Sequence, residues 1–188
     1  MKRKVLLAGA LFLVLGVIGL VSQQDRSGPQ GAVLTGVWYW QNLMPSPPLP
    51  PGLILPSVLT FHNDGTVFCS DALAFGGISN NPNRYTPFYG VWERMGPNEF
   101  RATWLTLRFD GLTGMLLGIG RSRAKFAFSS DFDNFEGTMH LDFLPCVGGN
   151  PFMCPDPLLA QDSDWQPWSL TSPSDYSFKA ARISVVPY

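Results

Sequence analysis

LTFHNDGTVFC, residues 59–69, decides the fold class, because it predicts two β-strands joined by a tight turn. Leu59 and Phe61 alternate with polar residues, and this period of two is typical of a strand that buries one face. Asn63-Asp64-Gly65 separates the two apolar runs. Asp-Gly favours a two-residue turn with positive φ angles, so the stretch predicts an antiparallel hairpin.

The same pattern continues along the chain. Gly96-Pro97-Asn98 and Asp110-Gly111 are further turn signals between runs rich in aromatic and β-branched residues. These runs show no sustained apolar period of 3.6 residues, so the fold class is mainly β. A meander of antiparallel strands protects its edges best by closing, which predicts a roughly eight-stranded barrel. We expect its strands at 34–42, 57–63, 66–72, 86–94, 99–109, 113–128 with a break at its glycines, 134–144 and 177–186.

Alternation also assigns side chains to the two faces of a strand. One face of the strand at 134–144 holds Gly137, Met139, Leu141 and Phe143, and the other holds Thr138, His140 and Asp142. The same count places His62 opposite Leu59 and Phe61. Both histidines of the chain are therefore expected on the outer face of the barrel.

The N-terminal segment predicts export. Basic residues at 2–4 precede a run of seventeen uncharged residues, Val5–Val21. Basic residues resist translocation, so the N-terminus is expected in the cytoplasm and the rest outside. The apolar core of a signal peptide has roughly 7–15 residues, whereas a membrane-spanning helix has roughly 17–25. The length of the apolar run therefore favours a retained anchor. A cleaved signal peptide is the alternative.

This gives a three-part organisation. We expect residues 1–24 to form one transmembrane helix in the inner (cytoplasmic) membrane, residues 25–32 to form a linker, and residues 33–188 to form the periplasmic or other extracytoplasmic barrel. Gly9 and Gly16 lie on one face of the expected helix and are candidates for close helix packing in the bilayer.

Composition excludes two classes of protein. The chain is 45% hydrophobic and 14% charged, which excludes a disordered chain, and its formal net charge of -1 excludes a polybasic nucleic-acid binder. Without the three basic residues at 2–4 the formal charge is -4. Attachment to anionic lipid by charge is therefore not expected, and membrane attachment would depend on the helix.

The three cysteines divide into a pair and a single residue. Cys146 and Cys154 enclose the short, turn-rich sequence VGGNPFM, and an exported chain meets an oxidising compartment. We expect a disulfide between them. Cys69 lies on an expected strand beside Phe68 and is predicted to be a buried small side chain rather than a reactive thiol.

The first and last strands carry a family resemblance. Gly36-Val37-Trp38 on the first strand and Arg182 on the last, with a meander between them, resemble the calycin or lipocalin pattern. In that family the tryptophan packs near an arginine and closes one end of the barrel. The resemblance implies that Trp38 and Arg182 are structural partners and that the barrel could carry a small hydrophobic ligand. Gly90-Val91-Trp92 repeats the motif within the chain.

Two long loops are candidates for docking. The loop at 43–56 contains Pro47, Pro48, Pro50 and Pro51, and the loop at 145–175 contains Trp165 and Trp168. Aromatic side chains and rigid prolines are common where proteins meet, so we expect these residues to form a docking surface. The alternatives for the tryptophans are a plug over the barrel mouth and anchoring among lipid headgroups.

No catalytic or metal site is predicted. A hydrolase needs a nucleophile, a base and an orienting group, whereas this chain has two histidines and no Gly-x-Ser-x-Gly elbow. His140 and Asp142 are too few for a metal site. The segment that contains Asp131, Asp133, Asn134 and Glu136 lacks the glycine of a calcium loop, so we expect an ordinary polar turn. A basic stripe is formed by Arg121, Arg123 and Lys125, and we assign no ligand to it.

The function expected from these observations is structural. The chain would be a non-enzymatic accessory subunit, anchored by residues 5–21, that stabilises a larger respiratory or photosynthetic membrane complex and needs no cofactor. The alternative is a calycin-like carrier of a small hydrophobic ligand. An enzyme of barrel type, such as a cyclase, is a third interpretation for which no acid-base pair can be named.

Overall fold

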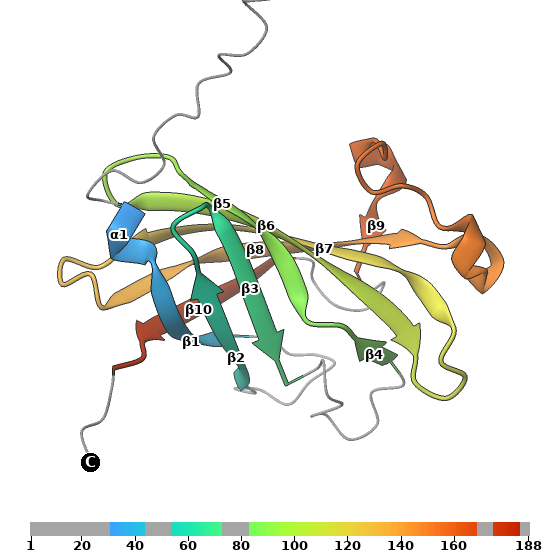
Figure 1. Cartoon of the computed structure of the whole chain (residues 1–188), viewed down its shortest axis with the longest axis horizontal. Coiled ribbons are helices and arrows are strands. Elements are labelled where there is room, and N and C mark those ends of the chain that lie inside the picture. The colour runs from blue at the N-terminus through green and yellow to red at the C-terminus, as the bar shows by residue number, and fades with distance from the viewer. Residues whose placement is uncertain (1–30, 44–53, 73–82, 169–174, 185–188) are drawn as a thin grey trace, which may run out of the picture.

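The structure is a computed structural model that describes residues 31–43, 54–72, 83–168 and 175–184 (Figure 1). Its elements are α1 (Gly31–Leu34), β1 (Gly36–Leu43), β2 (Ile54–Phe61), β3 (Thr66–Asp71), β4 (Asn83–Tyr85), β5 (Phe88–Arg94), β6 (Glu99–Asp110), β7 (Leu116–Phe128), β8 (Asn134–Pro145), β9 (Gln166–Pro167) and β10 (Asp175–Arg182). Three 3-10 turns, η1 (Val147–Gly149), η2 (Pro151–Met153) and η3 (Asp162–Asp164), lie between β8 and β9.

Eight strands form a closed antiparallel barrel. Their order is β1, β2, β3, β5, β6, β7, β8 and β10, and β10 pairs with both β8 and β1 to close the ring. The eight-stranded barrel expected from the sequence is confirmed, and each expected strand overlaps one of these. Two short strands were not expected: β4 pairs with the end of β6, and β9 pairs with β8.

Several local details differ from the sequence predictions. Strand β7 continues through Gly118 and Gly120, but its register against β6 shifts at Gly118, because Arg108 pairs with Gly118 and Phe109 pairs with Leu116. A Cβ atom would collide with the Leu144 carbonyl at Gly118 and with the Trp168 ring at Gly120. The hairpin turn at 63–65 has three residues, with a φ of 85° at Gly65 alone, rather than two residues with positive φ. The expected linker at 25–32 overlaps α1, which starts at Gly31.

The barrel interior is filled with aromatic side chains. Trp40 stacks on Phe178 with ring centroids 3.6 Å apart, and Phe126 lies 4.7 Å from Phe135. Trp38 is fully buried at the α1 end. Burial of such rings supplies much of the hydrophobic stabilisation of a small domain, and their tilted and edge-to-face contacts add to it.

The expected membrane helix at 1–24, with Gly9 and Gly16, lies outside the described residues, as do Pro47, Pro48, Pro50 and Pro51. Among the residues that are described, no helix has the length and apolar character needed to cross a bilayer.

Candidate interaction sites

Trp38 and Arg182 are in contact at the α1 end of the barrel. The two residues are neighbours in the β1–β10 register, and the Arg182 guanidinium lies 4.3 Å from the centroid of the Trp38 ring. Arg182 also donates to the carbonyl oxygens of Val33 and Thr35, and Trp38 Nε1 donates to the Leu34 carbonyl at 2.9 Å. The contact expected between Trp38 and Arg182 is present, and it fixes α1 across the barrel end.

A charged cluster lies on the outer face of β7 and β8. Asp142, whose side chain is 8% exposed, accepts from Arg121 at 2.9 Å and from Arg123 at 2.8 Å. His140 lies between two carboxylates, with Nε2 2.9 Å from Asp142 and Nδ1 2.7 Å from Asp175. Asp142 is paired with two arginines, and His140 bridges Asp142 and Asp175, so the arrangement joins β7, β8 and β10 on the outer wall.

The sequence reasoning missed this cluster. It described Arg121, Arg123 and Lys125 as a stripe without a ligand and placed His140 and Asp142 on the outer face, whereas Asp142 is buried by its partners. The available signal was the cross-strand register, which sets Arg121 opposite Asp142 and Arg123 opposite His140. Opposite charges facing each other across strands stabilise a sheet.

Trp165 packs on the outer wall of the barrel. It is 8% exposed, it contacts Ile119 and Leu144, and its ring lies 4.1 Å below the Arg121 guanidinium. Asp162 pairs with the same arginine at 3.1 Å. The chain after β8 therefore folds back over β7 and β8 and holds this side chain there.

Trp168 lies on the inner side of the barrel wall. Its ring stacks on Tyr85 with centroids 5.4 Å apart, meets Phe143 edge to face, and covers Gly120. The Arg108 guanidinium lies 5.7 Å from the Trp168 ring. Trp165 and Trp168 are therefore both packed against other parts of the chain, and neither indole is free for docking. The position of Trp168 matches the alternative in which the tryptophan folds back onto the barrel as a plug.

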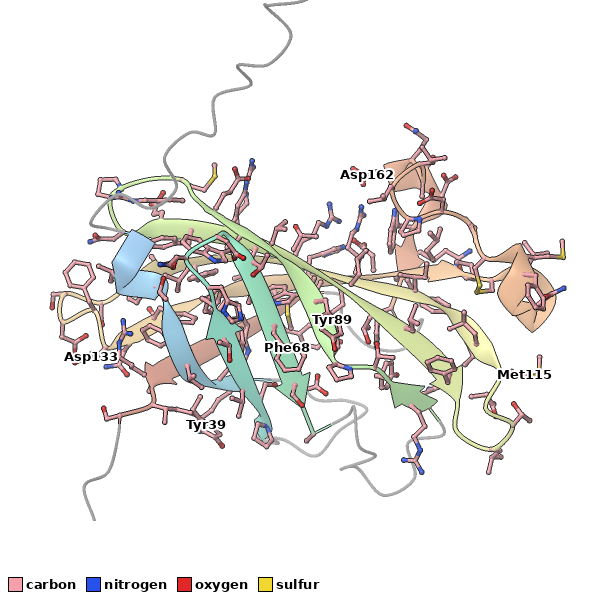
Figure 2. The ribbon with its side chains drawn as sticks, viewed as in Figure 1. Tyr39, Phe68, Tyr89, Met115, Asp133 and Asp162 are labelled. Carbon is pink, nitrogen blue, oxygen red and sulfur yellow. A yellow bond between two sulfur atoms is a disulfide. The ribbon has the colours of Figure 1, made fainter. Side chains whose placement is uncertain are left out.

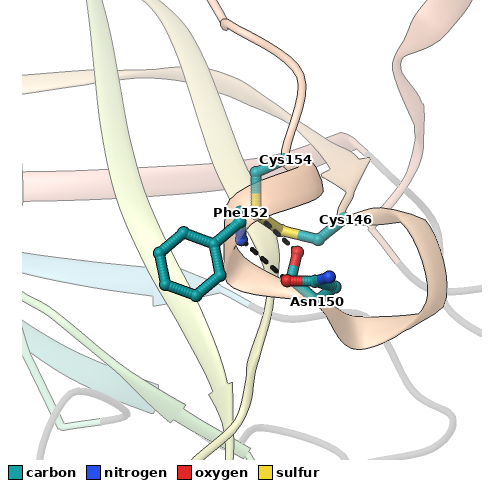
Figure 3. The surroundings of a disulfide bond; sticks show 4 residues. All are labelled: Cys146, Asn150, Phe152 and Cys154. Carbon is teal, nitrogen blue, oxygen red and sulfur yellow. Dashed lines mark hydrogen bonds between the residues drawn. A yellow bond between two sulfur atoms is a disulfide. The ribbon is translucent and has the colours of Figure 1, made fainter.

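The disulfide loop, defined here as residues 146–168, is ordered by covalent and hydrogen bonds. Cys146 and Cys154 form the expected disulfide (Figure 3). Within the ring that they close, Asn150 Oδ1 accepts from the Phe152 amide at 2.9 Å. Asp156 Oδ1 likewise accepts a hydrogen bond from the Leu158 amide at 2.8 Å. Further along the loop, Gln161 and Asp164 form a capping box around η3. The backbone is thus held in one shape.

This loop and the β6–β7 turn present apolar side chains to solvent. Phe152 is 96% exposed, Leu112 91%, Leu158 85% and Leu159 75%, and Val147, Met153 and Met115 are also exposed. We call these seven residues the distal cluster, because they lie at the end of the molecule opposite α1 (Figure 1; Figure 2 labels Met115 at this end and Asp133 at the other). The sequence reasoning selected the tryptophans of the loop and missed these residues.

The charges around the distal cluster have one sign. The segments 109–120 and 145–168 contain Asp110, Asp156, Asp162 and Asp164 and no lysine or arginine. Asp162 is paired with Arg121, and Asp110 accepts from the amides of its own turn, which lowers its pKa. Exposed apolar side chains therefore stand among carboxylates.

The barrel interior also holds a polar atom without a partner. Among the described residues, Trp104 Nε1 is buried and makes no hydrogen bond, and the Trp104 ring meets Trp40 edge to face at 5.7 Å. Ser57 Oγ lies beside the Cys69 thiol. Trp40 is the β-sheet neighbour of Ser57. Cys69 packs beside them and burial raises the pKa of its thiol, so it is protonated, as expected for a structural cysteine.

The described part of the chain contains no group of three or more His, Cys, Asp or Glu side chains placed to hold a metal ion. Asp131 accepts from the Asp133 amide and from Asn134 in the turn between β7 and β8, so this segment is the polar turn that its spacing predicts. His62 is exposed at the end of β2.

Comparison with known proteins found no family model, no curated protein and no solved structure that matches the chain. The closed barrel is compatible with the calycin-like fold expected from Trp38 and Arg182.

Proposed function

We propose that this protein is an exported, calycin-like accessory subunit, anchored by residues 5–21, that docks onto other subunits of a membrane complex through the distal cluster. The observation that carries the proposal is the exposure of Phe152 within the ring closed by the disulfide, and of Leu158 and Leu159 just after it. A backbone that is already fixed by a disulfide and hydrogen bonds loses little entropy when its apolar side chains bind, so this surface is suited to binding.

The charges of the loop favour a protein partner. Anionic lipid would repel Asp156 and Asp164, whereas an apolar pocket with lysine or arginine at its rim would attract them. The position of the cluster also favours this partner, because the chain enters the barrel at α1, at the opposite end (Figure 1). A barrel attached to the membrane through α1 would extend the distal cluster away from its own anchor.

The test uses the full chain extracted from the source membranes in mild detergent and run on a native gel. The unaltered protein should comigrate with other subunits, and the double variant Phe152→Ser, Leu158→Ser should migrate free. Met95→Ser is the matched control, because Met95 is exposed on the β5–β6 turn, outside the distal cluster. A lone monomer for the unaltered protein would contradict the proposal.

A carrier of a small ligand is the second candidate, favoured by an unpartnered donor inside the barrel. Trp104 Nε1 could donate to a carbonyl or hydroxyl oxygen on an otherwise apolar molecule. Titration with anilinonaphthalene sulfonate should show saturable binding that weakens in Trp104→Phe. Trp92→Phe is the control, because Trp92 Nε1 already donates to the His62 carbonyl at 2.9 Å. Absence of saturable binding would exclude this carrier.

A further inference from the structure

One wall of the barrel has no charged side chain in its centre. Eleven outward side chains of β1, β2, β3 and β5 form one group of neighbours along and across these strands, and none of them is charged. We call them the uncharged wall: Val37, Tyr39, Gln41, Pro56, Val58, Thr60, Thr66, Phe68, Ser70, Tyr89 and Val91. Val58 is 42% exposed, Val91 56% and Tyr89 62%, so the wall is open to solvent.

The cross-strand register makes this wall continuous. Tyr39 lies beside Val58 on β2, and Thr60 lies beside Phe68 on β3. The Phe68 and Tyr89 rings then meet with centroids 5.1 Å apart. Figure 2 shows Tyr39, Phe68 and Tyr89 on one side of the molecule.

The opposite wall differs sharply. The outward positions of β6, β7, β8 and β10 carry Glu99, Arg101, Arg121, Arg123, Lys125, Glu136, His140, Asp142, Asp175 and Lys179. Charged residues are normally spread over a soluble surface, whereas they are depleted at the centre of protein interfaces, where tyrosine and phenylalanine are enriched. The division of charge between the two walls therefore marks the uncharged wall as an interface.

We propose that the uncharged wall pairs with the same wall of a second copy of this chain in a two-fold dimer. A two-fold interface brings one patch against itself, so a charge close to the symmetry axis meets its own kind. The uncharged wall avoids this repulsion, and the wall bearing Arg121, Arg123 and Lys125 does not.

The polar members of the wall favour a second copy over lipid. Thr60 and Ser70 have hydroxyl groups that both donate and accept, so a second copy supplies hydrogen-bond partners for them. Hydrocarbon supplies none, and burying an unpaired hydroxyl costs free energy. A wall four strands wide spans about 19 Å at ~4.8 Å per strand, which is a small interface. Confinement of both copies to one membrane would raise their effective concentration and offset the small area.

The test is disulfide trapping of the full-length chain in membranes. Thr60→Cys places a thiol near the centre of the uncharged wall, and Thr138→Cys places one at an outward threonine of β8 as the control. Cys146 and Cys154 are already bonded and Cys69 packs against the core, so only the introduced thiol is available. Mild oxidation should convert most Thr60→Cys chains to a dimer and leave Thr138→Cys chains monomeric. Equal yields from the two variants, or no dimer from Thr60→Cys, would overturn the proposal.

A charge on the wall supplies the second readout. Adding Val58→Lys to the Thr60→Cys variant brings like charges together in the dimer and should lower the yield of trapped dimer at least tenfold. Adding Thr138→Lys to the same variant should leave that yield unchanged. An unaltered melting temperature shows that the variants fold. If lipid vesicles protect the Thr60→Cys thiol from oxidation and no dimer forms, the uncharged wall contacts the bilayer. This result would overturn the proposal that two copies pair. Loss of the distal cluster should leave the trapped yield unchanged, so this proposal and the docking proposal fail separately.

Discussion

Arg182 joins the last strand to the first through several contacts of one side chain. The Arg182→Ala variant removes the cation–π contact with Trp38 and the hydrogen bonds to the carbonyls of Val33 and Thr35. We expect a loss of about 3 kcal/mol in the free energy of unfolding, measured by urea denaturation. Lys179→Ala, on the same strand but exposed, should change it by less than about 0.5 kcal/mol. Similar losses for the two variants would contradict the structural role of Arg182.

Asp142 is the buried centre of the outer charged cluster. The Asp142→Asn variant keeps the side-chain shape but leaves Arg121 and Arg123 without their shared carboxylate. Breaking a buried pair by removing one partner costs about 3 kcal/mol or more, so the urea midpoint should fall with little change in slope. Asp175→Asn removes an exposed partner of His140, and its effect should be small. An unchanged midpoint in Asp142→Asn would show that the cluster does not stabilise the wall.

At the scale of elements, the disulfide loop depends on its covalent closure. Replacing both Cys146 and Cys154 with alanine removes a bond between residues eight apart, which should lower the free energy of unfolding by about 2–3 kcal/mol. The near-ultraviolet circular dichroism of the barrel should persist, because the aromatic core lies elsewhere. In the native-gel experiment this variant should bind its partner more weakly. If the complex is fully retained in this variant, the distal cluster does not need the disulfide in order to bind its partner.

Three turns between strands depend on ionised carboxylates. Hydrogen bonds from Thr66 lower the pKa of Asp64, those from Thr113 lower the pKa of Asp110, and those from Ser129 and the Asp133 amide lower that of Asp131. A lowered folded pKa means stabilisation that is present above the ordinary value of 3.8 and is lost as the pH falls through the folded value. The difference in stability between the unaltered protein and Asp110→Asn should therefore be present at pH 7 and shrink toward pH 2. A difference that does not change with pH would contradict this.

The sequence predicted the strands well because burial on one face imposes a period of two, as at Leu59 and Phe61. It missed β4 and β9, whose three and two residues are too short to show a period. The positions of Trp165 and Trp168 could not be predicted either, since they depend on which wall the returning chain covers. The burial of Asp142 depends in the same way on register across β7 and β8, which alternation within one strand does not give.

For the whole molecule, the retained anchor is the expectation on which the membrane location depends. Intact mass of the protein from source cells should include residues 1–22 and should rise by two hydrogens on reduction, when the bond between Cys146 and Cys154 opens. A mass that begins downstream of Val21 would show a cleaved signal peptide and remove the membrane tether. The barrel and its distal cluster would stand unchanged in that case, as parts of a secreted protein.

Closure of the ring by β1 and β10 has a consequence for biogenesis. Trp38 and Arg182 are adjacent in space but come from opposite ends of the translated sequence. Contacts so distant in sequence form slowly, and these cannot form at all until the final strand has emerged from the translocation channel. We expect the nascent polypeptide to remain an open, unsealed sheet throughout its passage.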